Sequence, residues 1–265
     1  MTNTIKNVFV EFWTNTKLYF TVQKDEGPKN LKQYFSDWSL WEKCWIGIAT
    51  IAIVLASIWT WDPTNLMGSS AALISSITGI WCVLLVAKGK ISNYIWGLVN
   101  VILYAYAAYT WGLFGDFTLN AFIFLPMQFI GWHFWVKPKN KKSADDVKVK
   151  FLSTKGRIIW AAISVVAVVA YGFILKLNPA QLTPFFDSTS TVLSIIAVVL
   201  MAKLFMEQWV LWIIVDVVTV IMWANIVFFQ ESGLYNIGIL IMWIAFLTNA
   251  IFGLYNWIKM NKEQE

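Results

Sequence analysis

A single carboxylate, that of Asp216, lies deep inside a long apolar stretch of the sequence. It stands about ten residues, or roughly 15 Å of helix, from the start of that stretch, which is mid-membrane depth for a spanning helix. Such a group is costly in lipid, so either it contacts a substrate or it hydrogen-bonds a neighbouring helix. Trp212 lies one helical turn before Asp216, and Trp209 lies a further turn back. A tryptophan face beside a carboxylate can hold a flat cationic ring, although packing alone also explains any one tryptophan.

In other apolar stretches, uncharged amide side chains lie at about the same predicted membrane depth as Asp216. Asn100 matches Asp216 in depth, and Gln128 and Asn249 also lie mid-stretch. An amide offers donors and acceptors together, which suits a substrate with hydroxyl or carboxamide groups. A strongly anionic substrate would call for buried lysine or arginine, and the apolar stretches contain neither. The candidate binding residues are therefore Trp212, Asp216, Asn100, Gln128, Asn249, Asn120, Trp209, Asn236, Tyr104 and Asn225, with Trp81, Trp223 and Trp243 as weaker candidates.

The sequence offers little other chemistry. His133 is the only histidine and has no cysteine or carboxylate cluster around it in the sequence, which disfavours a metal site. No nucleophile–base arrangement and no phosphate-binding glycine loop is visible. We therefore expect no enzyme, no cofactor and no built-in ATP-driven pump. Cys44 and Cys82 lie at or inside apolar stretches, so no disulfide framework is implied.

Composition sets the class of protein that must position these residues. Of 265 residues, 58% are hydrophobic and only 13% are charged, about half the share usual in a soluble domain. A soluble fold of this size could not bury so much apolar surface, and a disordered chain would not contain it. The net charge of +5 does not indicate nucleic-acid binding, because the charges lie in the loops between apolar stretches. The sequence predicts an all-α integral membrane protein.

Eight apolar stretches are long enough to cross a bilayer, which takes about 20 residues each. They cover residues 44–61, 69–87, 92–111, 114–136, 158–175, 188–202, 206–229 and 234–258. The loop over residues 137–157 carries eight basic residues against two acidic ones, so the positive-inside rule predicts that it is cytoplasmic. With eight spans, both termini are then cytoplasmic, and of 20 basic residues only Lys176 falls outside.

The chain also repeats itself. Residues 83–88 resemble residues 198–203, residues 95–101 resemble 211–217, and residues 135–137 resemble 257–259. The two copies are spans two to four and spans six to eight, and equivalent spans are four apart, so both copies point the same way across the membrane. Span five is the inverting linker. Parallel repeats are a known transporter plan that places the site between the copies, near the bilayer midplane.

These observations divide the chain into six parts. Among the N-terminal residues, Ile5, Val8, Phe9, Phe12 and Trp13 recur at helical spacing, which indicates either an amphipathic helix on the inner leaflet or a frayed tail. The parts are an N-terminal cytoplasmic or interfacial segment (1–43), an extra transmembrane helix and loop (44–68), a first three-helix repeat (69–137), a basic cytoplasmic loop and linker helix (138–186), a second three-helix repeat (187–259) and a cytoplasmic tail (260–265).

Two motif blocks resemble the PnuC family of vitamin transporters. The first comprises the Lys-Ile-Ser-Asn-Tyr run at 90–94, then Gly97, Asn100, Gly131-Trp132 and Trp135. The second comprises Phe-Asp-Ser at 186–188 and Val-Leu-Ser-Ile at 192–195, followed by the Trp209, Trp212 and Asp216 region. The two blocks occur in the family's order, and the resemblance covers about residues 69–258.

The resemblance implies a three-plus-one-plus-three helix core related to that of the SWEET sugar transporters. It implies homotrimers in the bacterial inner membrane that import nicotinamide riboside, a precursor of NAD, by facilitated diffusion, with a cytoplasmic riboside kinase trapping the substrate. Trp212 and Asp216 would then suit the pyridinium ring, and Gln128, Asn100 and Asn249 the carboxamide and ribose. The family often has Asn where this chain has Asp216. The alternatives are a thiamine or sugar carrier on the same scaffold, or a membrane subunit that transports nothing.

Overall fold

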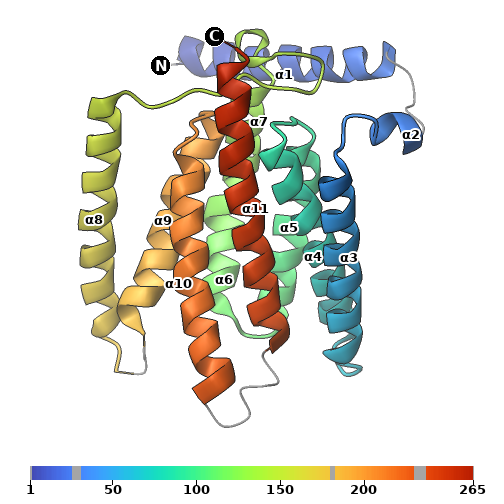
Figure 1. Ribbon diagram of the computed structural model, residues 1–265. Coiled ribbons are helices and arrows are strands. Elements are labelled where there is room, and N and C mark those ends of the chain that lie inside the picture. The colour runs from blue at the N-terminus through green and yellow to red at the C-terminus, as the bar shows by residue number, and fades with distance from the viewer. Residues whose placement is uncertain (1, 26–30, 180–182, 230–236, 265) are drawn as a thin grey trace. The chain divides into compact units, whose positions relative to one another are not determined.

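The structure, a computed structural model, describes residues 2–25, 31–179, 183–229 and 237–264, and helices account for nearly all of its regular structure. The chain divides into two compact units, Met1–Lys148 and Val149–Glu265. The elements of the first unit are α1 (Thr2–Asp25), α2 (Leu31–Tyr34), α3 (Leu40–Trp59), α4 (Leu66–Ala87), α5 (Asn93–Thr110), α6 (Phe114–Thr118), η1 (Leu119–Phe124), α7 (Leu125–Trp135) and η2 (Pro138–Asn140). Those of the second are α8 (Thr154–Lys176), α9 (Pro184–Ala202), α10 (Gln208–Phe229) and α11 (Ile237–Lys262) (Figure 1).

Six helices in the described part of the chain are long and apolar enough to cross a membrane: α3, α4, α8, α9, α10 and α11. The predicted span at 92–111 coincides with α5, whose two asparagines and several tyrosines make it more polar. The predicted span at 114–136 is built from α6, η1 and α7 in succession, and each of these is short. The all-helical membrane class is confirmed, and the total of eight spans stays a prediction.

The break in the fourth predicted span has a chemical cause. Residues 119–124 form a π-helical segment that ends two residues before Pro126. Proline has no amide N–H to donate to the carbonyl of Phe122, so the regular α-helical ladder is interrupted there. A π-helical segment widens the turn and re-aims the side chains it carries.

The turn between consecutive helices has the same geometry in both units. After α4, Gly89 adopts a φ of +67°, and the amide of Lys90 donates to the carbonyl of Leu85 over 2.9 Å. After α9, Leu204 adopts a φ of +66°, and the amide of Phe205 donates to the carbonyl of Leu200 over 3.0 Å. Both are left-handed helix endings that satisfy the last carbonyls of the helix.

The loop that follows the first unit's helices pairs with each of these turns. In the first unit the amide of Val147 donates to the carbonyl of Gly89 over 3.0 Å. In the second unit the amide of Lys150 donates to the carbonyl of Leu204, also over 3.0 Å. Matching residues in the two turns are separated by 115 positions in the chain.

The helix that follows each left-handed turn carries an aromatic side chain near its start, and the ring of this side chain packs against a glycine of a neighbouring helix. Tyr94 of α5 lies against Gly131 of α7 and makes an edge-to-face contact with the buried Trp135, with ring centroids 5.2 Å apart. Trp209 of α10 lies against Gly253 of α11 and makes the same kind of contact with Trp257 at 5.9 Å. In each case the missing Cβ lets the ring approach the helix backbone, which sets the packing of the two helices.

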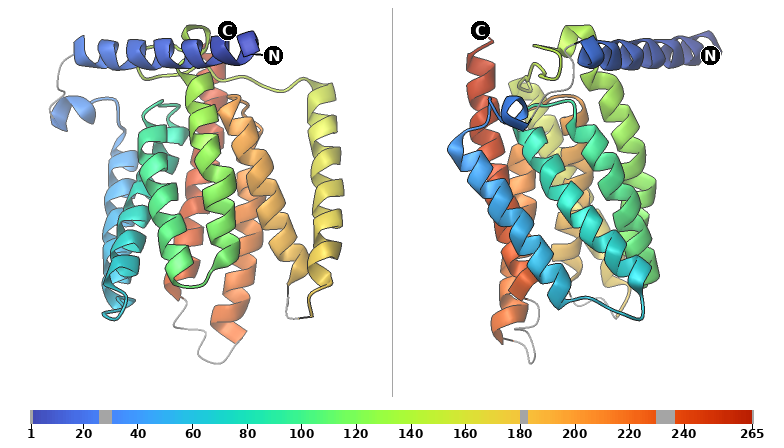
Figure 2. Two further views of the ribbon diagram at one scale, coloured as in Figure 1. Left: turned by 180° about the vertical axis from the view of Figure 1, so that it is seen from behind. Right: turned by 90° about the vertical axis from the view of Figure 1, so that its right-hand side faces the viewer.

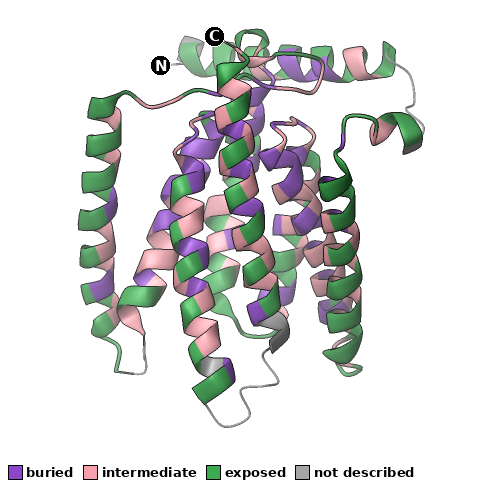
Figure 3. Ribbon diagram, in the orientation of Figure 1, coloured by how far each residue is buried: buried purple, intermediate pink, exposed green. Residues whose placement is uncertain are grey.

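Burial is uneven along the helices (Figure 3). Helices α4 and α9 are about half buried, whereas α3 and α8 expose most of their side chains. Because those exposed side chains are mainly Ile, Val, Leu and Phe, these two helices present surfaces suited to lipid.

Candidate functional site

Asp216 is a buried carboxylate on α10, with 4% of its surface exposed. Among the described residues, no hydrogen bond or ion pair reaches it. An unpaired buried carboxylate is costly, so its presence calls for a ligand or for water. Trp212, one turn earlier on α10, is half-buried, which leaves part of its indole ring available for contact.

Trp209 has a different environment from Trp212. It is 3% exposed, and its ring is wedged between Gly253 and Trp257 of α11. The packing interpretation therefore accounts for Trp209. Of these two tryptophans on the same helix, Trp209 therefore serves packing, whereas Trp212 remains partly accessible.

Asn100 cross-links two helices of the first unit. Its Nδ2 donates to the backbone carbonyl of Ser75 on α4 over 2.8 Å. A Cβ placed on Gly79 would lie 2.7 Å from the same nitrogen, so the glycine makes room for the amide. This contact matches the interhelical hydrogen bond that the sequence left open as an alternative to substrate contact.

Gln128 of α7 presents a buried amide to α5 and α4. It is 8% exposed and lies against Gly97, with the sulfur of Cys82 nearby. Its Oε1 finds no hydrogen-bond donor among the described residues. Leaving a buried amide oxygen without a donor costs about 1–3 kcal/mol in lost solvation, and a hydrogen bond from a ligand or a water can recover this energy.

The remaining candidates fall in varied surroundings. Asn120 is buried in η1, where its Nδ2 donates to the backbone carbonyl of Asp116 over 2.9 Å. Asn249 of α11 is buried, whereas Tyr104 and Asn225 are exposed. Asn236 lies outside the described residues.

Aligning the two copies on their equivalent turns changes which residue of the first copy corresponds to Asp216. With a separation of 115 positions, the equivalent of Asp216 is Val101, and the equivalent of Asn100 is Val215. The two polar groups therefore differ by one residue, or about 100° around a helix, from the sequence pairing of Asn100 with Asp216. They have similar depth but face different directions on their own helices.

The sequence did not single out Gln208. It is fully buried at the start of α10, and neither its Oε1 nor its Nε2 has a partner among the residues the structure describes. Its equivalent by turn register, Asn93, is also fully buried, and Asn93 Nδ2 donates to the carbonyl of Lys90 over 2.6 Å. The signal that would have found both is the polar residue four positions after the left-handed turn residue in each copy.

The sequence also gave no sign of an apolar groove of about 750 Å³ among α8, α9 and α10. Its lining includes Trp160, Leu193 and Val210, with the Arg157–Glu207 ion pair (2.7 Å) at its edge. None of the ten candidate residues lines this groove.

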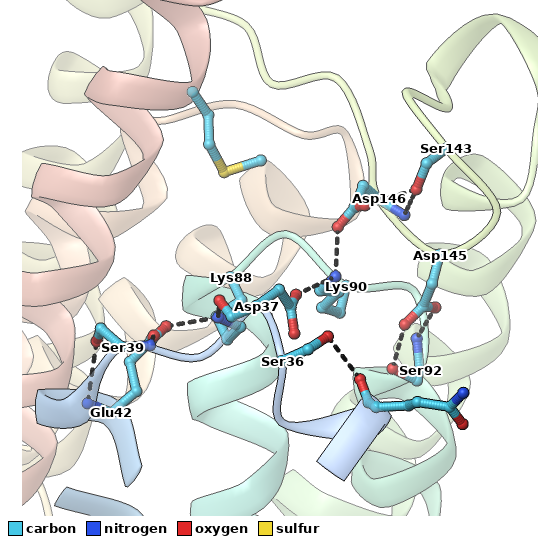
Figure 4. A network of polar contacts seen from close by, with 12 residues as sticks. Ser36, Asp37, Ser39, Glu42, Lys88, Lys90, Ser92, Ser143, Asp145 and Asp146 are labelled. Atoms are coloured by element: carbon cyan, nitrogen blue, oxygen red, sulfur yellow. Dashed lines mark hydrogen bonds and ion pairs between the residues drawn. The ribbon is translucent and has the colours of Figure 1, made fainter. Parts of the chain in front are cut away.

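A polar network at the end of the first unit ties distant segments together (Figure 4). Lys88 pairs with Glu42 over 2.7 Å, and Lys90 pairs with both Asp37 and Asp146 over 2.8 Å. Burial lowers the pKa of Lys90, but its hydrogen bonds to the two carboxylates outweigh this and raise its pKa above the ordinary value. The sequence had marked these lysines only as indicators of topology.

Asp145 is a second centre of this network. It accepts hydrogen bonds from the backbone amide and the hydroxyl of Ser92, over 2.9 and 2.7 Å, and from the hydroxyl of Tyr19 over 2.8 Å. Burial raises the pKa of Asp145, and these hydrogen bonds offset part of the rise. The carboxylate thereby joins α1 to the start of α5.

An all-helical membrane protein with a buried carboxylate on α10 and buried amides on α7 and α11 has the features of a transporter for a small polar solute. A family model described as nicotinamide mononucleotide transporter matches residues 69–259. The chain belongs to this family, which agrees with the resemblance seen over residues 69–258, and it is a transporter rather than an enzyme.

Relatives cover most of the chain. It is 35% identical over 235 residues to the nicotinamide riboside transporter PnuC of Neisseria mucosa, covering 87% of this chain and 86% of that protein. It is 33% identical to the transporter of the same name from Haemophilus influenzae, covering 88% and 96%. A crystal structure of the vitamin B3 transporter PnuC shares 33% identity with a TM-score of 0.69, and the match covers 89% of this chain and all of that one.

Proposed function

We propose that this protein imports nicotinamide riboside across the bacterial inner membrane. The observation that carries the proposal is the match to nicotinamide riboside transporters over nearly the whole chain. The ligand's chemistry agrees with the residues, because the riboside has a flat cationic ring, a carboxamide and ribose hydroxyls. Trp212 and Asp216 would hold the ring, and buried amides such as Gln128 would bind the polar groups.

The family model's description names the mononucleotide, which differs from the riboside by one phosphate. Binding that phosphate inside a membrane requires buried cations. The sequence has no lysine or arginine at positions 66–87, 91–136, 184–202 or 204–258, which together contain the three predicted spans of each copy. This absence favours the riboside over the mononucleotide.

The proposed mechanism is alternating access without an energy source of its own. In it, eight spans leave both termini in the cytoplasm, and two parallel three-helix copies rock about a midplane site. The identical left-handed turns after α4 and α9, and the matching ring-on-glycine contacts after them, support the two copies. A cytoplasmic riboside kinase would keep the imported substrate from leaving, and the functional unit would be a homotrimer.

Calorimetry on the purified protein tests the substrate. Nicotinamide riboside, nicotinamide mononucleotide, thiamine and a hexose are titrated under the same conditions. Binding of the riboside alone is the expected result. Binding of the mononucleotide without the riboside would reject the proposal, and binding of thiamine or hexose alone would move the protein to another carrier on the same scaffold.

A further inference from the structure

Helix α1 buries several polar side chains and exposes several large aromatic ones, which is the reverse of what an ordinary surface helix does at those positions. Asn15 and Thr16 are buried, together with Tyr19. Phe9, by contrast, is 61% exposed, and Phe20 is 51% exposed. A helix that turns polar groups toward the protein and aromatic groups outward is suited to a non-aqueous surrounding.

The buried polar residues of α1 are explained by what they touch on α7. The indole Nε1 of Trp132 donates to the hydroxyl of Thr16 over 2.9 Å, and Tyr19 packs edge-to-face on the same indole ring at 5.0 Å. Phe12 stacks on His133 at 6.1 Å. Helix α1 thus lies across the end of α7, as Figures 1 and 2 show, and residues 2–25 are a docked helix and not a frayed tail.

Glu11 adds an ion pair to this docking, with its carboxylate 3.0 Å from the Nζ of Lys137. The hydrogen bond from Lys137 lowers the pKa of Glu11, so this carboxylate stays ionised near neutral pH. The carboxylate of Glu11 is therefore paired with a lysine of the protein and is not left as an unpaired negative charge on α1.

The outward side of α1 carries two adjacent stripes. At 100° per residue, Phe9, Trp13 and Phe20 share one line along the helix. The three lysines of α1 lie roughly 50° further round, in a second line, because their spacings are eleven and seven residues. The members of this lysine stripe are Lys6, Lys17 and Lys24, all exposed.

We propose that α1 binds the anionic phospholipids of the inner leaflet through these two stripes. The aromatic stripe reaches the boundary between headgroups and acyl chains, where amphipathic rings are favoured. The lysine stripe lies beside it at the depth of the phosphates, and lysine side chains extend to such a level readily. Charge complementarity selects anionic lipid, because the cytoplasmic leaflet is negatively charged and each nearby lysine strengthens attachment about fivefold.

The leaflet follows from the contacts of α1. The helix is bonded to Lys137 and Asp145, which belong to the loop that the charge distribution assigns to the cytoplasm. The consequence for transport is mechanical. Because Asp145 accepts hydrogen bonds from both Tyr19 and Ser92, a helix fixed in the interface also holds the start of α5.

Hydrogen–deuterium exchange on the full-length protein tests the proposal. The protein is placed in nanodiscs of phosphatidylcholine alone, or with added phosphatidylglycerol, and exchange is followed over residues 2–25. The anionic lipid is expected to slow exchange by at least about fivefold. Raising the salt concentration should shrink the difference, since exposed charges are screened.

Two triple variants of equal charge change separate lysine recognition from charge in general. Lys6→Gln, Lys17→Gln and Lys24→Gln together remove three charges from the stripe and should abolish most of the phosphatidylglycerol effect. Asn7→Glu, Thr14→Glu and Thr21→Glu together lower the net charge by the same amount on an exposed side that lies roughly 70° beyond the lysine stripe and about 120° from the aromatic stripe, and they should leave most of the effect in place. An unchanged exchange rate in phosphatidylglycerol for the parent protein, or equal loss in both variants, would overturn the proposal. Equal protection of residues 2–25 in both lipids would show that α1 contacts the membrane through its aromatic stripe without selecting anionic lipid, which also overturns the proposal.

Discussion

At the scale of single residues, environment separates side chains that the sequence makes equivalent. Trp209 and Trp212 lie on one helix within a turn of each other, yet only Trp209 is locked against a glycine. Asn100 and Gln128 are both amides in predicted spans, yet Asn100 has a backbone acceptor on the neighbouring helix and the Oε1 of Gln128 has no donor among described residues. An unsatisfied group and a partly accessible ring are the better candidates for ligand contact.

Replacing Trp212 by alanine should weaken riboside binding by about 1–3 kcal/mol, the usual worth of stacking a flat ring on an aromatic side chain. Calorimetric titration measures the loss directly. Trp209→Ala is the contrasting variant, because it removes a core ring and should lower stability by about 3–5 kcal/mol. An unchanged affinity in Trp212→Ala would remove this residue from the site.

Gln128→Met should affect binding and stability in opposite directions. A buried amide with an unpaired oxygen is replaced by an apolar group of similar shape, so thermal stability should stay equal or rise slightly. Riboside affinity should fall by about 1–3 kcal/mol if the amide binds the substrate. Loss of stability with unchanged affinity would show that Gln128 serves packing alone.

At the scale of elements, helices in this protein are positioned by a few close approaches. The rings of Tyr94 and Trp209 each occupy space that a side chain on the facing glycine would need. The two contacts start from equivalent turns, which places α5 against α7 and α10 against α11 in a similar manner.

Gly131→Ala and Gly253→Ala should each destabilise the protein by about 1–3 kcal/mol, because a rigid ring must shift to admit the new methyl group. Thermal unfolding in detergent measures the change. Gly47→Ala in α3 is the matched control, since nothing lies within 4 Å of the added Cβ and helix propensity should give a small gain. A cost in Gly47→Ala equal to that of the other two would contradict the steric explanation.

Thr16→Val should loosen α1 without changing its shape. The substitution leaves the buried indole N–H of Trp132 without its acceptor, at a cost of about 1–3 kcal/mol. Faster hydrogen exchange across α1 would report the change. Thr14→Val, on the exposed side of the same helix, should leave exchange nearly unaltered, and equal effects of the two would indicate that the Trp132 contact does not hold the helix.

At the scale of the whole molecule, the proposed uncoupled mechanism predicts that transport follows only the electrochemical gradient of the cationic riboside itself. In vesicles containing a riboside kinase and ATP, dissipating the pH gradient while the membrane potential is held constant should leave uptake unchanged, because no proton is moved with the substrate. Tracer accumulation measures it. A collapse of uptake would refute the mechanism and make Asp216, the buried carboxylate of α10, a candidate for carrying the proton.

The sequence by itself determined the membrane class, the family, most helix positions and the likeness of residues 83–88 to residues 198–203, because apolar segment length, loop charge and motifs are properties of local sequence. Helix α9, for example, begins four residues earlier than its predicted span and ends at the predicted residue. The sequence also located the polar residues within the apolar stretches, since these are costly wherever they occur.

Only the tertiary structure decided which of those residues are satisfied and what the N-terminal segment does. Tyr19 and Asp145 are 126 positions apart, and nothing in either neighbourhood indicates that they form a hydrogen bond. The same holds for Trp132 with Thr16 and for Asn100 with Ser75. Such pairs depend on which helix faces meet after folding, and the meeting of faces is set by packing between distant segments and not by local propensity.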